Sequence, residues 1–258
     1  MKVIVCKDYA EVSAKSAEIV ADVMKKKPNA VLGLATGSTP EGMYAKLAEM
    51  NKAGEIDFSQ VTTVNLDEYY PISPDNDQSY RYFMNKNLFD KVNIDKTHTH
   101  VPQGSAADGE AEAKRYEKFV RSLGGADIQV LGIGRNGHIA FNEPGSSLSS
   151  RTRQKTLTTD TIIANSRFFD NDVNKVPKTA LTVGVGTVMD AKEVLIVCNG
   201  HGKARALQHA IECAVSQEWT ISALQMHRKG IIVCDDAATD ELKVGTYRYF
   251  KDIEKDNL

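Results

Sequence analysis

The sequence predicts an α/β fold: a doubly wound, mostly parallel, Rossmann-like sheet with helices on both faces. Short runs of Val, Ile and Leu, apolar on successive residues, recur along the chain. Such runs are typical of strands that are covered on both faces. Segments with helical spacing lie between them, and a regular alternation of strand and helix indicates parallel strands joined by helical crossovers.

The individual elements follow from these patterns. The expected strands are Val3–Cys6, Val31–Leu34, Val61–Leu66, Ile128–Ile133, Leu181–Val185, Val194–Cys198 and Ile231–Cys234. The expected helices include Tyr9–Lys26, Glu41–Met50, Ala111–Leu123 and Lys203–Val215. The sequence contains no internal repeat, low-complexity tract or long Gly/Ser linker, so we expect residues 1–258 to form a single domain.

One segment departs from the alternation. Residues 144–172 are polar, rich in Ser, Thr, Asn and Arg, and weakly periodic. A long irregular segment in a compact domain is often functional, so we expect a lid over the sheet edge at about 144–185. A plain surface excursion is the alternative interpretation.

Charge and cysteine usage restrict the function classes. The 258 residues include 32 basic and 34 acidic side chains, a net charge of -2. A chain without a global basic field is not expected to bind nucleic acid or an anionic membrane, and any anion recognition must be local. Cys6, Cys198 and Cys234 end apolar runs, where buried, reduced thiols indicate a reducing compartment. The apolar stretch at the N-terminus is too short for a secretory or membrane-spanning segment. A cytoplasmic protein is expected.

Ligands of doubly wound sheets bind beyond the carboxyl ends of the strands, so the turns that follow the apolar runs are the candidate sites. The first is the turn Thr36-Gly37-Ser38-Thr39, which precedes Pro40 and a predicted helix. A glycine-containing turn before a helix offers free amides to a phosphate. Capping of the helix by the hydroxyl groups explains the same residues.

The second turn carries Asp67 and Glu68 directly after a predicted strand. A carboxylate in that position can act as a proton-transfer base if its surroundings adjust its pKa. Acidic pairs in loops are more often solvated, so the signal is weak when taken alone.

The third turn, Gly132 to His138, has the GxGxxG spacing of a dinucleotide site. That interpretation fails because Pro144 and Gly145 interrupt the helix that should follow, and no acidic residue stands at the required distance. What remains is a flexible turn that presents His138, with Glu143 near in sequence as an orienting carboxylate. The alternative is a structural histidine.

The fourth turn, Asn199 to Lys203, is similar to an ATP-binding P-loop only in composition. The GxxxxGK[ST] spacing is absent, and Ala204 stands where a Ser or Thr would bind magnesium. Lys203 and Arg167 can each pair with a monophosphate, or both can be ordinary surface cations. The pair His98 and His100 has no further His or Cys near in sequence, so no metal site is expected.

Six motifs, taken together, resemble the glucosamine-6-phosphate deaminase family over nearly the whole chain. In order they are ATGSTP, NLDEYY, GIGRNGHIAFNEPGSS, SRTRQKTLT, ANSRFFDNDVNKVPKTALTVGVGT and WTISALQ. The resemblance implies ring opening of glucosamine 6-phosphate, a proton shift from C2 to C1, and hydrolytic loss of ammonia to give fructose 6-phosphate. It implies no cofactor.

The resemblance also implies roles for particular residues. Asp67 matches the proton-shuttling base, and His138, supported by Glu143, matches the residue that assists ring opening. Asn136 stands where many members have Asp; because an amide adds no negative charge, His138 should be a weaker base here. The phosphate-binding positions match Thr36, Gly37, Ser38, Thr39, Arg167 and Lys203.

Allosteric members of the family bind N-acetylglucosamine 6-phosphate between the subunits of a hexamer. The matching positions are Ser146, Ser147, Arg153, Lys155, Thr156 and Tyr249. All six carry suitable groups, so the resemblance implies a homo-oligomer, a hexamer by preference, with an activator site. Other members are simple monomers.

Two alternative functions remain. A 6-phosphogluconolactonase-like hydrolase would share the fold, but that family tends to have Asp-Glu-Arg where this chain has Asp67-Glu68-Tyr69, and Gly-His-Thr where it has Gly137-His138-Ile139. A non-catalytic sugar-phosphate sensor is disfavoured because a sensor needs no proton shuttle.

Overall fold

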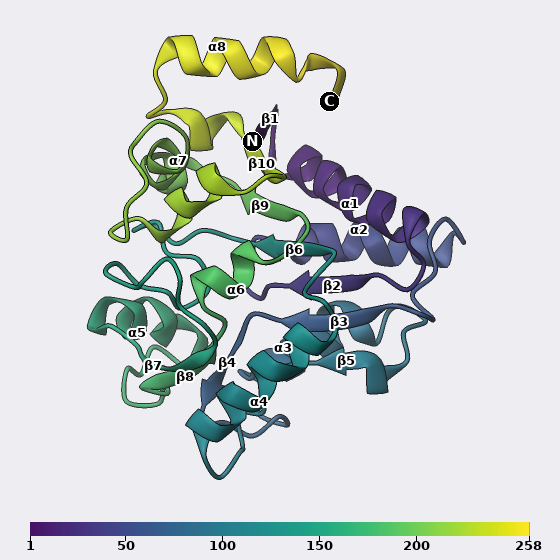
Figure 1. Cartoon of the computed structure of the whole chain (residues 1–258), viewed down its shortest axis with the longest axis vertical. Coiled ribbons are helices and arrows are strands. Elements are labelled where there is room, and N and C mark those ends of the chain that lie inside the picture. The colour runs from purple at the N-terminus through teal and green to yellow at the C-terminus, as the bar shows by residue number, and fades with distance from the viewer. Residues whose placement is uncertain (258) are drawn as a thin grey trace.

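The computed structural model describes residues 1–257 as an α/β domain (Figure 1). The strands are β1 (Lys2–Cys6), β2 (Val31–Leu34), β3 (Thr62–Asn65), β4 (Asp67–Tyr70), β5 (Thr99–His100), β6 (Ile128–Leu131), β7 (Arg153–Thr156), β8 (Thr179–Thr182), β9 (Val194–Cys198) and β10 (Gly230–Asp235). The α-helices are α1 (Tyr9–Lys26), α2 (Glu41–Lys52), α3 (Tyr80–Met84), α4 (Gly109–Ser122), α5 (Thr159–Asn165), α6 (Val185–Met189), α7 (Ala204–Ile211) and α8 (Val244–Ile253).

The main sheet has seven strands in the order β1-β10-β9-β6-β2-β3-β5. All of its paired strands are parallel. The predicted doubly wound, mostly parallel sheet is therefore confirmed. The two-residue strand β5 at its edge is not among the strands expected from the apolar runs, because two residues are too few to show a period.

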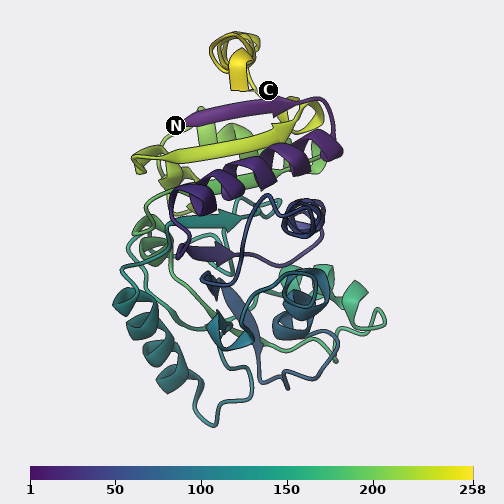
Figure 2. The same ribbon diagram turned by 90° about the vertical axis from the view of Figure 1, so that its right-hand side faces the viewer.

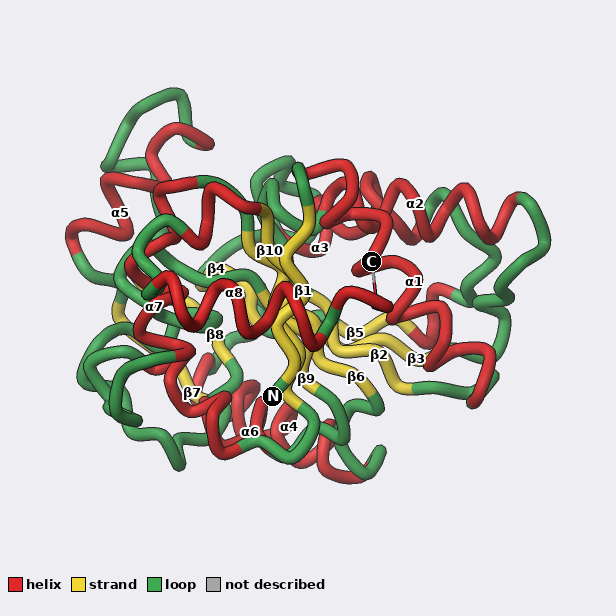
Figure 3. Tube along the Cα trace, turned by 90° about the horizontal axis from the view of Figure 1, so that it is seen from above, coloured by secondary structure: helices red, strands yellow, loops and turns green. Residues whose placement is uncertain are grey.

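Successive strand residues point to opposite faces of the sheet and enter two different cores. Val3 and Val5 pack on the face covered by α4, α6, α7 and α8. Ile4 and Cys6 pack on the face covered by α1 and α2. Figure 2 shows α1 lying along β1 and β10, and Figure 3 shows α8 crossing above β1. Burial on both faces explains why the strands are apolar on successive residues.

The prediction that Leu181–Val185 is a strand of the main sheet is wrong. The strand there is β8, which pairs antiparallel with β4 and β7 in a separate three-stranded sheet. Ala180 and Leu181 are fully buried, so the run is apolar on successive residues although its partners are different. Strand β8 ends at Thr182, and Gly184 is the N-cap residue of α6, which begins at Val185. The apolar pattern reports burial, not the choice of partner strand.

The segment at 144–185 contains β7, α5 and β8 rather than an irregular loop. These elements lie beside the carboxyl edge of the main sheet, with α5 at one flank of the molecule (Figures 1 and 3). Within residues 1–257, no helix is both long and apolar enough to cross a membrane.

Candidate active site

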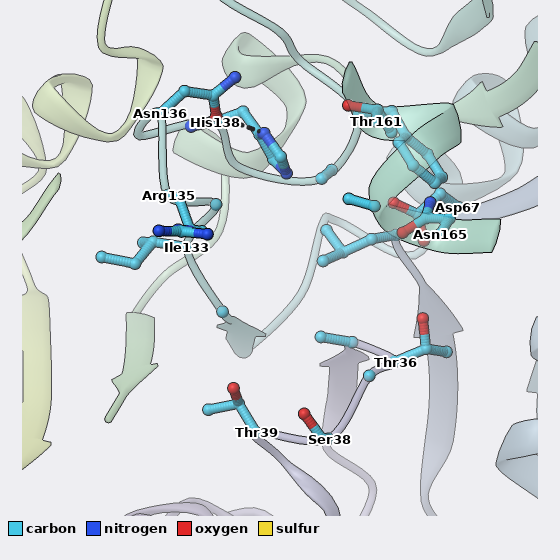
Figure 4. A pocket seen from close by; sticks show the side chains of 18 of the residues that line it. Thr36, Ser38, Thr39, Asp67, Ile133, Arg135, Asn136, His138, Thr161 and Asn165 are labelled. Carbon is cyan, nitrogen blue, oxygen red and sulfur yellow. Dashed lines mark hydrogen bonds between the residues drawn. The ribbon is translucent and has the colours of Figure 1, made fainter. Parts of the chain in front are cut away.

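The turns after β2, β3, β6 and β9 line one cavity of about 700 Å³ at the carboxyl edge of the sheet (Figure 4). Strands β2 and β6 are neighbours there, and the chain leaves them in opposite directions, toward β3 and toward β9. A reversal of this kind opens a crevice between the two loops, which is where ligands of doubly wound sheets bind. All four candidate segments contribute to it, although Asp67 and Glu68, which were expected in a turn, begin strand β4.

The Thr36–Thr39 turn forms one end of the cavity. Gly37 has a φ of +99°, a conformation that favours glycine. The Tyr9 hydroxyl donates to the backbone oxygens of Ser38 and Thr39, at 3.0 Å each, and fixes the turn. The N-cap residue of α2 is Pro40, and it makes no side-chain capping bond. Within residues 1–257 the side-chain hydroxyl groups of Thr36, Ser38 and Thr39 make no hydrogen bond. They do not cap α2 and are free to bind a ligand.

Lys203 and Arg167 bring positive charge to the same cavity. The Lys203 ammonium donates one hydrogen bond to the backbone oxygen of Ile133, at 2.6 Å, and has further protons to offer. Burial lowers the pKa of Lys203, and the nearby cations Arg135 and Arg167 lower it further. A site whose cations repel one another favours an anion. Cations and free hydroxyl groups together suit a phosphate.

Asp67 and Glu68 have different surroundings. Glu68 is buried and accepts N–H bonds from Tyr69, Tyr80 and Arg81, so its carboxylate anchors the start of α3. Asp67 lines the cavity, and its carboxylate makes no hydrogen bond with residues 1–257. Burial, with a smaller effect of the Glu68 charge, raises the pKa of Asp67 to about 8. A buried carboxyl with a raised pKa facing a cavity is suited to proton transfer near neutral pH.

His138 is held by a chain of hydrogen bonds that reaches Glu143. The Asn136 amide donates to the Glu143 carboxylate at 3.1 Å, and its oxygen lies 2.6 Å from His138 Nδ1. Because an amide oxygen can only accept, Nδ1 carries the proton and Nε2 is free to act as a base. The ring projects into the cavity (Figure 4).

Glu143 is buried behind this chain rather than in the cavity wall. Burial would raise the pKa of its carboxyl, but hydrogen bonds from His138, Thr161 and Asn136 prevail and lower the pKa to about 2. The carboxylate therefore stays ionised while it orients the Asn136–His138 pair. His138 Nδ1 also lies 3.5 Å from the Glu143 carboxylate, so the histidine and the predicted orienting carboxylate are neighbours, and Asn136 contacts both of them.

Two glycines make the histidine turn sterically feasible. A Cβ at Gly134 would lie 2.3 Å from the His138 ring. A Cβ at Gly137, whose φ is +75°, would lie 2.4 Å from Trp219. No helix begins at these glycines, which agrees with the rejection of a dinucleotide fingerprint.

The segment around Thr220 supports the turn that carries His138. The sequence did not predict this contact. Thr220 Oγ1 accepts from the Ile139 amide at 3.3 Å and donates to the Asn142 oxygen at 3.0 Å. The Ile221 amide donates to the Gly137 oxygen at 2.9 Å. The WTISALQ motif contains these residues, but about 80 residues of chain separate it from the turn, so no local pattern could reveal the contact.

The sequence patterns also did not predict that α5 forms one wall of the cavity. Thr161 and Asn165 line the cavity near Asp67, together with Asp160 and Ala164. The Thr161 hydroxyl also donates to Glu143, so it ties α5 to the histidine chain. Arg135, in the third candidate turn, lines the cavity as well. Arg135 lies between Gly134 and Asn136 in sequence, and this position could have indicated that it lines the cavity.

The six residues matched to an activator site do not form one cluster within a single chain. Arg153 and Lys155 belong to β7, whereas Tyr249 lies on α8, which Figure 1 places at the opposite end of the molecule. Ser146 is buried, and Arg153 donates to Asn142 at 2.7 Å. Ser147 and Thr156 are exposed. A site using all six therefore requires a second subunit.

The fold and the cavity define a class of protein: a doubly wound α/β protein that presents cations, a carboxyl and a histidine to a small anionic ligand. The chain belongs to the family of glucosamine-6-phosphate isomerases and 6-phosphogluconolactonases, whose model matches residues 8–233.

Individual members of the family show which of its proteins this chain resembles. It is 62% identical over 264 residues to a glucosamine-6-phosphate deaminase of Phocaeicola vulgatus, with both chains covered completely. A solved monomeric glucosamine-6-phosphate deaminase is 45% identical, with a TM-score of 0.90 over 92% of this chain and 98% of that one. A 6-phosphogluconolactonase from Trypanosoma cruzi has a TM-score of 0.74 over 94% of this chain and 97% of that one, but at 19% identity it shows the fold alone.

Proposed function

We propose that this protein is a glucosamine-6-phosphate deaminase, which converts glucosamine 6-phosphate and water to fructose 6-phosphate and ammonia. The proposal rests on one observation above all: a buried carboxyl and an oriented histidine share a cavity with a group of phosphate-binding residues. An aldose–ketose proton shift requires such a pair, together with an anchor that fixes the sugar against it.

The phosphate binds between the Thr36–Thr39 turn and the side chains of Arg167 and Lys203. Hydroxyl and amide groups of the turn donate to its oxygens, while the two cations neutralise its charge. The remote phosphate thereby supplies binding energy that holds the reacting carbons in place.

His138 begins the reaction by opening the sugar ring. Its unprotonated Nε2 takes the proton of the C1 hydroxyl group and delivers it to O5 as the C1–O5 bond breaks. Glu143, through Asn136, stabilises the imidazolium that forms and holds the ring in its orientation. The product of this step is the open-chain aldehyde.

Asp67 then removes the proton from C2, and the electron pair forms a C1–C2 double bond as the C1 oxygen takes a proton from the C2 ammonium group of the substrate. Asp67 returns the proton to C1, which leaves an imine at C2. Water adds to that carbon, and ammonia departs as the C2 ketone forms. The raised pKa of Asp67 makes its ionised form a stronger base than an ordinary carboxylate.

The lactonase alternative explains less of the site. Opening a lactone requires activation of water and not abstraction of a proton from carbon, so one base is sufficient and the pair Asp67 and His138 is not required. The chain also keeps Tyr69 and Ile139 where the lactonase loops tend to carry Arg and Thr.

An assay for ammonia decides between the two activities. Purified protein is supplied with glucosamine 6-phosphate in one reaction and with 6-phosphogluconolactone in another. Release of ammonia with formation of fructose 6-phosphate is expected in the first reaction only. Lactone hydrolysis without ammonia release would replace the deaminase by the hydrolase, and ligand binding without either reaction would indicate a sensor.

We also propose a role for the segment at 144–185 as the lid of this site. It is supported by α5, which supplies Thr161 and Asn165 to the cavity, and by Arg167 directly after it. In the same way, four free cysteines, three of them buried, support a reducing cytoplasmic location.

Activation by N-acetylglucosamine 6-phosphate is a further part of the proposal, with a hexamer as the assembly. It is supported by the six suitable side chains, and it needs neighbouring subunits to bring Tyr249 to Arg153. The 45% identical deaminase is a monomer, which favours the opposite outcome. Light scattering together with the ammonia assay, with and without the N-acetyl compound, tests it: a monomer whose rate does not change would remove both assembly and activation.

A further inference from the structure

Three cations line the cavity, and the sequence patterns assigned only two of them to the phosphate. The third is Arg135, on the turn that also carries Asn136 and His138. A Cβ built on Gly202 would lie 4.0 Å from Arg135 Nε, so the guanidinium group lies against the residue that precedes Lys203. Figure 4 shows its side chain between the histidine turn and the Ser38–Thr39 end of the cavity.

Arg135 forms no salt bridge with a carboxylate of residues 1–257, whereas Arg115, Arg121 and Arg151 each pair with an acidic side chain. The two carboxylates that line the cavity, Asp67 and Asp160, belong to β4 and α5. No protein carboxylate among residues 1–257 therefore compensates the positive charge of Arg135.

The charge of Arg135 acts on Lys203. After burial, Arg135 is the largest of the effects that lower the pKa of Lys203, ahead of Arg167. Two cations that repel each other across a cavity are both stabilised when a dianion binds between them. Arg135 can also offer two parallel N–H groups, the arrangement that matches phosphate oxygens best.

We propose that Arg135 is a third phosphate-binding residue, which ties the phosphate of the substrate to the turn that presents His138. The inference rests on the proposed function for the identity of the sugar, but its phosphate chemistry does not depend on turnover. Because Arg135 is exposed and forms no salt bridge or side-chain hydrogen bond within residues 1–257, its replacement should leave the fold intact.

The test compares the full-length wild-type protein with Arg135→Gln, Arg135→Lys and the control Arg228→Gln. Arg228 is also exposed, and it does not line the cavity. Calorimetry measures the dissociation constant of inorganic phosphate, and the ammonia assay measures KM and kcat with glucosamine 6-phosphate.

For Arg135→Gln we expect the phosphate dissociation constant and KM each to rise about tenfold or more, with kcat within about threefold, since one charge-assisted contact is lost. For Arg135→Lys both constants should lie between those of the wild type and Arg135→Gln, and for Arg228→Gln both should match the wild type. A phosphate affinity within twofold of wild type in Arg135→Gln would overturn the inference. So would a fall in kcat with phosphate affinity unchanged, because Arg135 would then act on His138 alone. A wild-type protein that binds phosphate but releases no ammonia would refute the proposed function and leave the phosphate comparison valid.

Discussion

At the scale of single residues, the environment of Asp67 determines what the site can do. Its carboxyl is buried in a cavity whose lining includes the aromatic side chains of Tyr80 and Phe141, and the charge of Glu68 repels its ionised form. Glu68 does not compete for the substrate, because three backbone N–H groups hold its carboxylate. Two adjacent acids that look equivalent in sequence thus have different roles: Glu68 anchors α3, and Asp67 is the base of the proposed mechanism.

The raised pKa of Asp67 predicts a pH dependence of catalysis. The base must be ionised to remove a proton, so kcat/KM should increase with pH through a limb near pH 8, which reports the free enzyme. A pH–rate profile of kcat/KM measures the limb. A flat profile between pH 6 and about 9 would show that Asp67 is already ionised or is not the base.

Replacement of the base separates binding from chemistry. Asp67→Asn should abolish ammonia release, while the affinity for glucosamine 6-phosphate stays within roughly tenfold, about 1.4 kcal/mol. Steady-state assays and calorimetry on the same preparation provide both numbers. Turnover at the wild-type rate would remove Asp67 from the mechanism.

At the scale of elements, the histidine turn depends on a segment that is remote in sequence. Thr220 bonds to backbone groups on both sides of His138, and Trp219 packs on Gly137. The catalytic geometry of the turn is therefore a property of two segments that meet in the fold, not of the GxGxxG-like pattern alone.

Thr220→Val should misplace His138, because the isosteric side chain keeps the packing and loses the hydrogen bonds. We expect kcat to fall about tenfold, with KM for glucosamine 6-phosphate within about threefold, since the phosphate site is separate. Thr220→Ser retains the hydroxyl group and serves as the matched control. Equal losses in the Val and Ser variants would mean that the methyl group, not the hydrogen bonds, supports the turn.

The elements also show how far the sequence can predict the site. The turns after β2, β3, β6 and β9 were predictable, because strand ends are local features and the topology brings them together. The wall formed by α5 was not, since its seven residues show little periodicity. The small sheet was misassigned for a different reason: β8 is as apolar as a central strand of the main sheet, and only the fold determines its partners.

At the scale of the whole molecule, the site costs stability. The pKa of Asp67 is about 8 in the folded protein, against about 4 in an unfolded chain. Between these values the folded state binds a proton that the unfolded state has released, so stability declines as the pH rises through this window. The decline from one such group is at most about 1.4 kcal/mol per pH unit.

This cost can be measured by urea unfolding of the wild type and Asp67→Asn. At pH 5 the carboxyl is protonated and the two proteins should be similarly stable. At pH 8 the variant should be more stable by about 1 kcal/mol or more, since it has no charge to bury. A stability difference that is the same at both pH values would show that burial does not perturb Asp67.

In the proposed mechanism the Thr36–Thr39 turn, Arg167 and Lys203 hold the phosphate, and this places the C1–C2 edge of the sugar between Asp67 and His138. A crystal structure of Asp67→Asn with glucosamine 6-phosphate tests this claim most directly. We predict the phosphate between the Thr36–Thr39 turn and Lys203, C2 within contact of residue 67, and the ring oxygen or C1 hydroxyl group at His138 Nε2. A sugar bound with its phosphate toward His138, or outside this cavity, would contradict the account.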